Sequence, residues 1–548
     1  MGHFVIESFS NGLDLRRSHD TAPPGSLRVL NNAFVNPGGE IEKRKSFFRH
    51  GALEFYGQTG NYKGRITGPF PTAQPAWGNN LSTRQGEVFF RHRHNSLPSG
   101  WTAGPGGAAA YITLGTKPPM KAWAMKSAIS LGADFGALLH GNATCLFGNF
   151  AFLIEQYFSD TITSDDNQNI KVTFDTATGR TDEPTADTRI TANDNFPSEV
   201  ILKSKGYVGG GTRLKASAVL DPGDMAGAGS GTVDTRTQSA PIGTIVGLGE
   251  YFGQLAVFGT RGVQFWDVDA NFALNQYLRT LAVSVIAPRT ITPYGDGDLI
   301  FLGRDGITSL RARDSSNLAA VDDVGSPIDK LIQAALNVAA APSETTDGVT
   351  TDLSTHYDYA TAAVHPGTGQ FWLFLKEKVY VLSVHKDAKV RAWSTFDLPD
   401  YIPNNVSTRN GPLKSRWCAD VCQISDDLIF RTFADEVFLY GGTTADAYDT
   451  SMVEVITPHM DFGKPGIEKT LHGFDIACTG TWKLEVSTNP NNIVWEEIGT
   501  FTNSTFAPSG RLPAEGTFTH MALRLTNETA ERATLGQVVV YYSGGDER

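Results

Sequence analysis

Cysteine is scarce in this sequence, which has four among 548 residues. They are Cys145, Cys418, Cys422 and Cys478. Four cysteines are too few for a disulfide framework in a chain of this length. Cys418 and Cys422 lie close together, but no histidine or second cysteine pair is near enough in sequence to complete a zinc site. We therefore expect buried free thiols.

Long apolar runs and standard catalytic motifs are also missing. No segment approaches the roughly 20 apolar residues that span a bilayer, and polar residues occur by position 7, so we expect neither a signal peptide nor membrane insertion by this chain. The phosphate-binding GxxxxGK motif, the HExxH zinc motif and the GxSxG nucleophile motif do not occur. We expect no catalytic, cofactor-binding or metal-ligating residues and no cofactor. The carboxylate pair of a glycosidase has no sequence motif of this kind.

Turn-forming residues are abundant, with 57 glycines and 27 prolines, and charged residues make up only 19% of the chain. Four strand–turn–strand units recur at residues 255–266, 299–310, 371–382 and 428–440. A single hairpin is marginally stable in water, so such units must stack or close on one another. Their spacing favours an all-β fold with a β-propeller-like body. A β-sandwich is the alternative for the same hairpins.

Composition divides the chain into five predicted parts. Residues 1–55 form an N-terminal arm with docking strands, and residues 56–160 form the first part of the body. Residues 161–240 form an inserted small β domain with mobile loops, and residues 241–450 form the main body. Residues 451–548 alternate apolar and polar residues and form a C-terminal β-sandwich. One helix is expected after Ser326-Pro327, where apolar residues recur at helical spacing.

Charge is distributed unevenly. Residues 1–126 contain 15 Lys and Arg against 7 Asp and Glu, and the remaining residues contain 31 against 51. An acidic body argues against sequence-specific nucleic-acid binding, because phosphate contacts need basic side chains.

Three segments together carry a family resemblance. They are NGLDLRR, PGSL and GGEIEKRKSF between residues 11 and 47, GDGDLIFLGRDGITSLRARD at 295–314, and DFGKPGIEKTLHGFDI at 461–476. Their order resembles tail nozzle proteins of short-tailed bacteriophages, also called tail tubular protein B or packaged-DNA stabilisation proteins.

The resemblance implies a structural virion protein and not an enzyme. It would form the distal tube of a phage tail, retain packaged DNA and give it a channel for ejection. The implied partners are five further copies in a hexameric ring, tail adaptor or portal-proximal proteins, tail fibre or spike proteins, and passing double-stranded DNA. The protein would be made in the host cytoplasm and located in the virion tail. The excess of acidic residues after residue 126 predicts that the lumen of the ring is acidic.

Basic residues near the N-terminus are the candidate interface of that assembly. Arg16, Arg17, Lys43, Arg44 and Lys45 lie beside apolar strand residues, and we expect them to dock on a tail adaptor or a neighbouring subunit. Deletion of residues 1–45 should then leave a folded body that no longer assembles. The alternative function is a propeller-type surface-polysaccharide hydrolase or carbohydrate-binding module.

Overall fold

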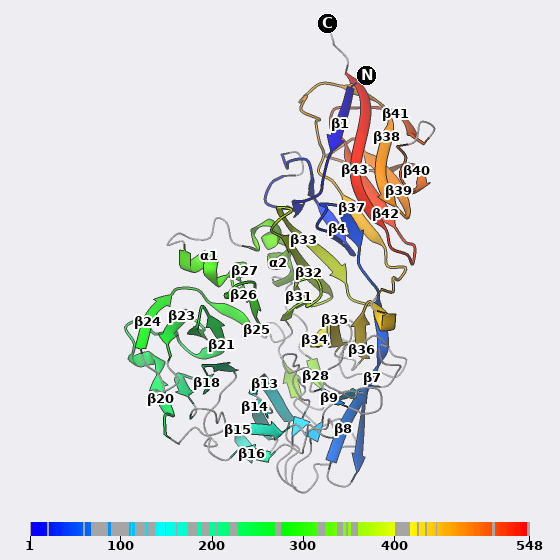
Figure 1. Ribbon diagram of the computed structural model, residues 1–548. Coiled ribbons are helices and arrows are strands. Elements are labelled where there is room, and N and C mark those ends of the chain that lie inside the picture. The colour runs from blue at the N-terminus through cyan, green and yellow to red at the C-terminus, as the bar shows by residue number, and fades with distance from the viewer. Residues whose placement is uncertain are drawn as a thin grey trace.

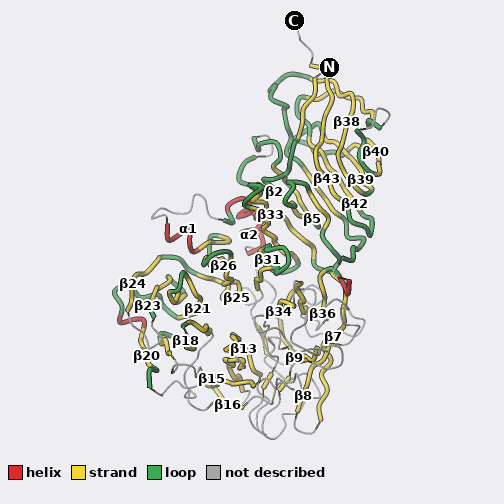
Figure 2. The backbone as a smooth tube through the Cα atoms, in the orientation of Figure 1, coloured by secondary structure: helices red, strands yellow, loops and turns green. Residues whose placement is uncertain are grey.

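Strands dominate the computed structural model (Figure 2). The structure describes residues 2–49, 200–268, 277–314, 324–336, 360–399 and 417–544 with short gaps, and elsewhere only the backbone of strands. Within these parts, α-helix is confined to α1 (Leu310–Ser315) and α2 (Asp329–Leu336). The Ser326-Pro327 turn precedes α2, which confirms the expected helix.

The lower part of the molecule consists of antiparallel sheets that follow one another along the chain around a common centre (Figure 1). The first two sheets contain β13 (Leu138–Phe147), β14 (Phe150–Ser159), β15 (Ile162–Thr173) and β16 (Thr185–Asp187), then β17 (Ser198–Leu202), β18 (Lys205–Gly210), β19 (Arg213–Ala216) and β20 (Gly231–Asp234). The next two contain β21 (Ile245–Tyr251), β22 (Gln254–Gly259), β23 (Val263–Asp267) and β24 (Gln276–Leu281), then β25 (Val285–Tyr294), β26 (Asp298–Gly303) and β27 (Gly306–Ser309). This succession confirms the all-β, β-propeller-like fold.

Neighbouring sheets of the body share apolar cores. Leu214 of β19 and Val257 of β22 belong to one buried cluster, and Phe258 of β22 and Phe301 of β26 belong to the next. Because successive side chains of a strand point to opposite faces, the sheet of β21–β24 packs on a neighbour at each face. The sheet of β17–β20, within the predicted insertion at residues 161–240, is therefore packed as one member of the series.

A strand from the N-terminal region completes the last sheet of the body. This sheet contains β34 (Cys418–Ile424), β35 (Asp427–Thr432), β36 (Glu436–Tyr440) and β7 (Phe47–Gln58), and it continues through β8 (Asn61–Ile66), β11 (Ile112–Leu114) and β9 (Gly86–Val88). Tyr440 pairs with Phe47, and Glu436 pairs with Ala52. The ring of Phe47 packs edge-on against Phe430, with 5.2 Å between ring centroids. Short pairs elsewhere are β10 (Ala109–Ala110) with β12 (Ala128–Ile129) and β28 (Glu344–Thr346) with β29 (Val349–Thr351).

Two sheets form the upper sandwich (Figure 1). One contains β41 (Leu512–Phe518), β38 (Lys469–Thr479), β43 (Thr534–Gly544), β6 (Ile41–Lys43) and β5 (Ala33–Val35), with β1 (Gly2–Ile6) on β43. The other runs from the body into the sandwich through β30 (Thr361–Val364), β31 (Phe371–Leu375), β32 (Lys378–His385), β33 (Val390–Asp397), β4 (Val29–Asn31), β37 (Val453–Ile456), β42 (Ala522–Asn527), β39 (Thr481–Ser487) and β40 (Glu496–Thr502), with β2 (Gly12–Leu13) and β3 (Ser26–Leu27) beside β33. The expected C-terminal sandwich is present.

The N-terminal segment is part of the sandwich and not a separate arm. Ile6, Leu30, Val35 and Ile41 are buried in the main core, where they contact side chains of the C-terminal strands. Deletion of residues 1–45 would remove strands from both sheets and expose this core to water. The burial of these strands argues against a folded body after such a truncation, and the outcome of the truncation stays a prediction.

Candidate functional site

Lys43, a candidate docking residue, is completely buried inside the chain. Its ammonium group donates hydrogen bonds to Asn527 Oδ1 at 3.1 Å and to the Thr529 carbonyl at 2.6 Å. Burial disfavours the charged form and lowers the pKa of Lys43 to about 8. Its partners lie in and after β42, so Lys43 fixes the N-terminal segment to the C-terminal strands.

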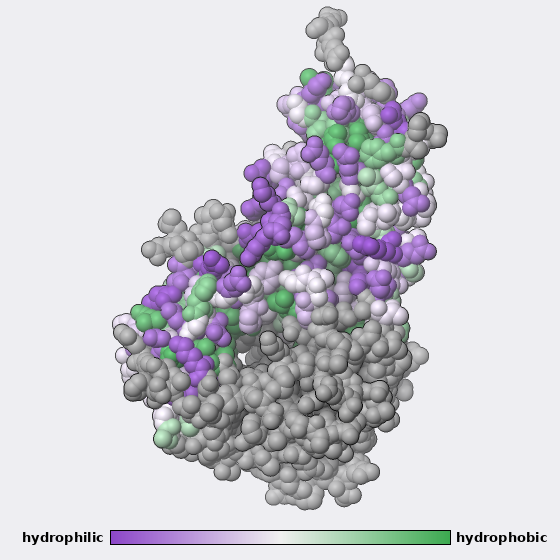
Figure 3. Space-filling model, in the orientation of Figure 1, coloured by the Kyte–Doolittle hydropathy of each residue, from purple (hydrophilic) through white to green (hydrophobic). Residues whose placement is uncertain are grey.

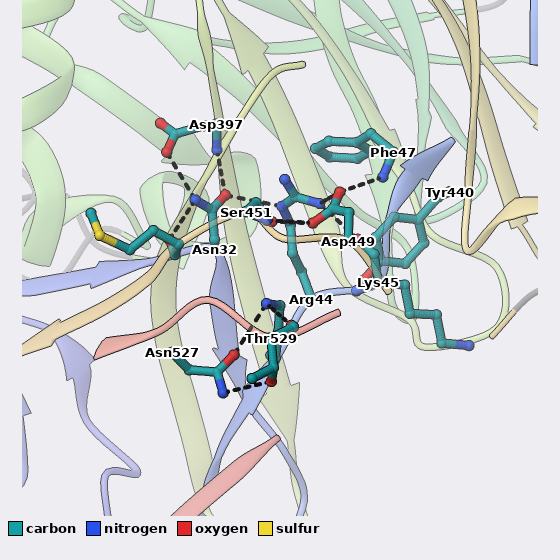
Figure 4. Close-up of polar contacts among 12 residues, drawn as sticks. Asn32, Arg44, Lys45, Phe47, Asp397, Tyr440, Asp449, Ser451, Asn527 and Thr529 are labelled. Atoms are coloured by element: carbon teal, nitrogen blue, oxygen red, sulfur yellow. Dashed lines mark hydrogen bonds and ion pairs between the residues drawn. The ribbon is translucent and has the colours of Figure 1, made fainter. Parts of the chain in front are cut away.

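Arg44 is also buried, with 3% of its surface exposed. Its guanidinium group lies 3.0 Å from Asp449 Oδ2, donates to Asn32 Oδ1 at 2.9 Å, and covers the ring of Phe47 (Figure 4). Burial alone would raise the pKa of Asp449, but the charge of Arg44 and hydrogen bonds from Ser451 outweigh it and lower that pKa. We call Asn32, Lys43, Arg44, Asp449 and Asn527 the basic junction.

The basic junction corrects part of the docking prediction. Lys43 and Arg44 cannot reach a neighbouring subunit, because residues of their own chain surround them and use their hydrogen-bond donors. Lys45 pairs loosely with Asp446 at 3.7 Å, Arg16 pairs with Asp14 at 2.8 Å, and Arg17 is exposed. Docking through these three residues stays a prediction.

His365 lies next to the basic junction and is buried. Its Nδ1 accepts a hydrogen bond from the backbone N–H of Thr368 at 3.3 Å, and its ring packs against Trp372 and Tyr440. Burial, together with the charge of nearby Lys45, lowers the pKa of His365 to about 4. This histidine is therefore neutral at physiological pH, and its contacts are those of a packed structural residue.

The outer face of the sandwich sheet formed by β37, β42, β39 and β40 has a different character. Along β39, Trp482, Leu484 and Val486 point into the core, and the alternate residues Lys483 and Glu485 are left on the outer face. Strand pairing sets Glu485 between Arg524 of β42 and Glu497 of β40. Hydrophilic and hydrophobic residues are mixed on the side of the upper sandwich seen in Figure 3.

Charged side chains form a continuous row across these four strands. Arg524 lies 2.8 Å from Glu454 and 3.3 Å from Glu485, and Lys483 lies 3.1 Å from Glu485 and 2.9 Å from Glu497. Hydrogen bonds with Glu497 and Glu485 raise the pKa of Lys483, which keeps the ammonium charged. The row thus offers alternating acceptors and donors at a partly exposed surface.

A tryptophan stands at the end of this row. Trp495 is half-buried and directly precedes β40, and the guanidinium carbon of Arg524 lies 5.9 Å from its ring centroid. The preceding Ile493 and Val494 are 53% and 65% exposed. The turn before them is held by Asn489, whose Oδ1 accepts hydrogen bonds from the backbone N–H groups of residues 491 and 492. We call Glu454, Lys483, Glu485, Trp495, Glu497 and Arg524 the tryptophan face.

The tryptophan face suits binding of a hydroxyl-rich ligand. Carboxylates accept and guanidinium and ammonium groups donate hydrogen bonds, so neighbouring hydroxyl groups of a sugar find both kinds of partner. The indole supplies an apolar surface for the C–H face of a sugar ring. Glycoside hydrolysis needs one carboxylic acid that gives up a proton, whereas Glu485 and Glu497 both pair with the ammonium group of Lys483.

Sequence analysis predicted the strands of this face but not its chemistry. The alternation in residues 481–487 marks Lys483 and Glu485 as outward-facing, yet their partners lie on strands whose order the sequence does not state. The available signal was that outward positions of several predicted strands carry opposite charges, beside a tryptophan after an Asn-Pro-Asn-Asn turn.

A scan against protein-family models and a search of curated proteins found no match for this sequence. Within the described residues, none of the helices is long and apolar enough to cross a membrane.

Solved structures that match include an exo-β-1,3-galactanase of Phanerochaete chrysosporium with galactose and a variant of the same enzyme with β-1,3-galactotriose. The first has 9% identity and a TM-score of 0.22, and the match covers 89% of this chain and 100% of that chain. The second has 9% identity and a TM-score of 0.20, and the match covers 73% and 95%. Likeness this low assigns no substrate and no catalytic residue.

The predicted tail nozzle function and the prediction that the chain is not an enzyme are not carried further, because the matching structures are of exo-β-1,3-galactanases and not of phage tail proteins. At TM-scores of 0.22 and 0.20 these matches do not assign the polysaccharide alternative either. The phage family resemblance, the hexameric ring, the tail partners and the virion location are tested by none of these comparisons and stay predictions from the sequence.

Proposed function

We propose that this protein is a carbohydrate-binding protein and that it binds a polysaccharide through the tryptophan face. The observation that supports it is the indole of Trp495 beside a row of five charged side chains on one face of the sheet. The ligand is a glycan chain laid across β37, β42, β39 and β40.

Geometry and charge both favour a glycan over other ligands. Adjacent strands are about 4.8 Å apart, a spacing close to the length of one sugar unit, so consecutive units can meet consecutive strands. Three carboxylates and two cations leave the face with a small negative charge, which disfavours nucleic acid and strongly acidic polymers. The partial exposure of Arg524 leaves its donors accessible to hydroxyl groups.

Affinity electrophoresis tests the proposal. The full-length protein is run in native gels that contain galactan, dextran, xylan or alginate, and retardation is measured against polysaccharide concentration. We expect retardation by at least one neutral polysaccharide. Trp495→Ala should weaken it about ten-fold, because stacking and its apolar contact are lost. Release of reducing ends from the same polysaccharide measures hydrolysis by the protein.

Val494→Ala is the matched control, because Val494 is the most exposed apolar side chain of the same turn and an apolar side chain forms neither a hydrogen bond nor an ion pair with the charged row. It should leave retardation unchanged. If the wild-type protein is retarded by none of the four polysaccharides, or if both variants behave like wild type, the proposal is wrong.

A further inference from the structure

An exposed aromatic residue lies in a strained backbone conformation on the body. Phe252 is at the tip of the hairpin between β21 and β22, with a φ of 47°, and 52% of its surface is exposed. The next residue, Gly253, also has a positive φ, of 72°, as in hairpin turns that usually contain Asn-Gly or Gly-Gly. A bulky residue at positive φ is uncommon and costs stability.

The ring of Phe252 is held in one position by its neighbours. It packs edge-on against Tyr251, with 4.8 Å between ring centroids, and the guanidinium carbon of Arg311 lies 5.6 Å from its centroid. It also lies against Gly297 in the turn between β25 and β26, where an added Cβ atom would approach the ring to 2.9 Å. The absence of a side chain at residue 297 thus makes room for the ring.

Polar groups surround this aromatic tip. Asp296, next to Gly297, is 93% exposed on its side chain and lies 3.8 Å from Lys386 of the turn between β32 and β33. Tyr251, which packs against this ring, donates a hydrogen bond from its hydroxyl to Asp314 at 3.1 Å, and Asp314 also accepts one from Arg279 at 2.7 Å. Turns from neighbouring sheets therefore come together near one exposed ring and several charged groups.

We infer that Phe252 is a second sugar-stacking contact, on the body, for a pyranose ring of the polysaccharide. The inference rests on the proposed function. Burial does not compensate the strain at Phe252, since half of the residue is exposed. A residue that tolerates positive φ would be less strained at this tip. An exposed ring fixed by Gly297 and Arg311 loses little freedom when a ligand binds.

The test combines stability and binding in the full-length protein. Phe252→Asn should unfold at or slightly above the wild-type temperature, by about 1 °C, because asparagine tolerates positive φ. In the same four polysaccharide gels, it should weaken retardation about five-fold. Phe252→Tyr keeps the ring and should bind like wild type. Lys389→Asn is the matched control, because exposed Lys389 has a φ of 54° in a hairpin turn and has no ring.

The outcomes separate this inference from the proposed function. If Phe252→Asn binds like wild type while Trp495→Ala does not, the inference is wrong and the proposed function stands. If Phe252→Asn unfolds several degrees below wild type, the ring is a packing residue and the inference is overturned. If the wild-type protein is retarded by none of the polysaccharides, both are wrong.

Discussion

The basic junction and the tryptophan face each contain an arginine bound to a carboxylate at nearly the same distance. Arg44 lies 3.0 Å from Asp449, and Arg524 lies 2.8 Å from Glu454. The Arg44 side chain is 3% exposed and the Arg524 side chain is 26% exposed. The same ion pair therefore fixes a strand connection in one region and lies at a partly exposed surface in the other. Burial, and not charge or distance, distinguishes the two regions.

The largest effect is expected at Arg44. Arg44→Met removes the counter-ion of Asp449 and a hydrogen-bond donor to Asn32. Breaking a fully buried pair costs about 3–5 kcal/mol. Because the Asp449 side chain is 31% exposed, we expect a smaller loss, of about 2–3 kcal/mol, in the free energy of unfolding, measured with chemical denaturant. A loss below 1 kcal/mol would show that the basic junction contributes no more than a surface pair.

Lys43 should make stability depend on alkaline pH. Its pKa is lowered from 10.5 to about 8, so between these values the unfolded chain binds a proton that the folded chain does not. Stability therefore rises as pH increases through this range. The difference in unfolding free energy between wild type and Lys43→Met should shift in favour of wild type by about 3 kcal/mol from pH 8 to 10.5. A constant difference would contradict the lowered pKa.

His365 should make the stability of the protein depend on pH in the acidic range. Its pKa is lowered from 6.5 to about 4, so the unfolded chain binds the extra proton between these values and stability falls as pH decreases from 6.5 to 4. We expect wild type to lose up to about 3 kcal/mol over this range relative to His365→Asn, which does not titrate. Thermal unfolding in a pH series measures this, and parallel curves for the two proteins would refute it.

The smallest stability effect is expected at Arg524. Arg524→Met should cost less than about 1 kcal/mol, because partly exposed ion pairs contribute little. In the polysaccharide gels the same variant should be retarded clearly less than wild type, although its free energy of unfolding changes little. If Arg524→Met destabilises the protein as much as Arg44→Met does, the two clusters have the same structural role, and burial does not distinguish the basic junction from the tryptophan face.

Local sequence patterns predicted the strands and the helix. The places of the charged and aromatic side chains depended on contacts between segments that are far apart in the sequence. Alternation around Trp482 gave the sandwich strand, and Ser326-Pro327 gave the start of the helix. Lys43 and Arg44 were interpreted as surface residues because charged side chains are seldom buried, and their partners Asn527 and Asp449 lie more than 400 positions along the chain. No local pattern reveals such a pairing. Trp495 was missed for the same reason, since its neighbour Arg524 is on another strand.

The pairing of β7 with β36 also sets the order of events during synthesis. β7 emerges from the ribosome early, but its partner β36 is made only after nearly the whole body. Until then β7 has an unpaired edge, and pairing over such a sequence separation is slow and vulnerable to aggregation. The sandwich core also waits, because β1, β5 and β6 need β43 at the far end of the chain. A chain truncated near the C-terminus should therefore depend on chaperones to stay soluble.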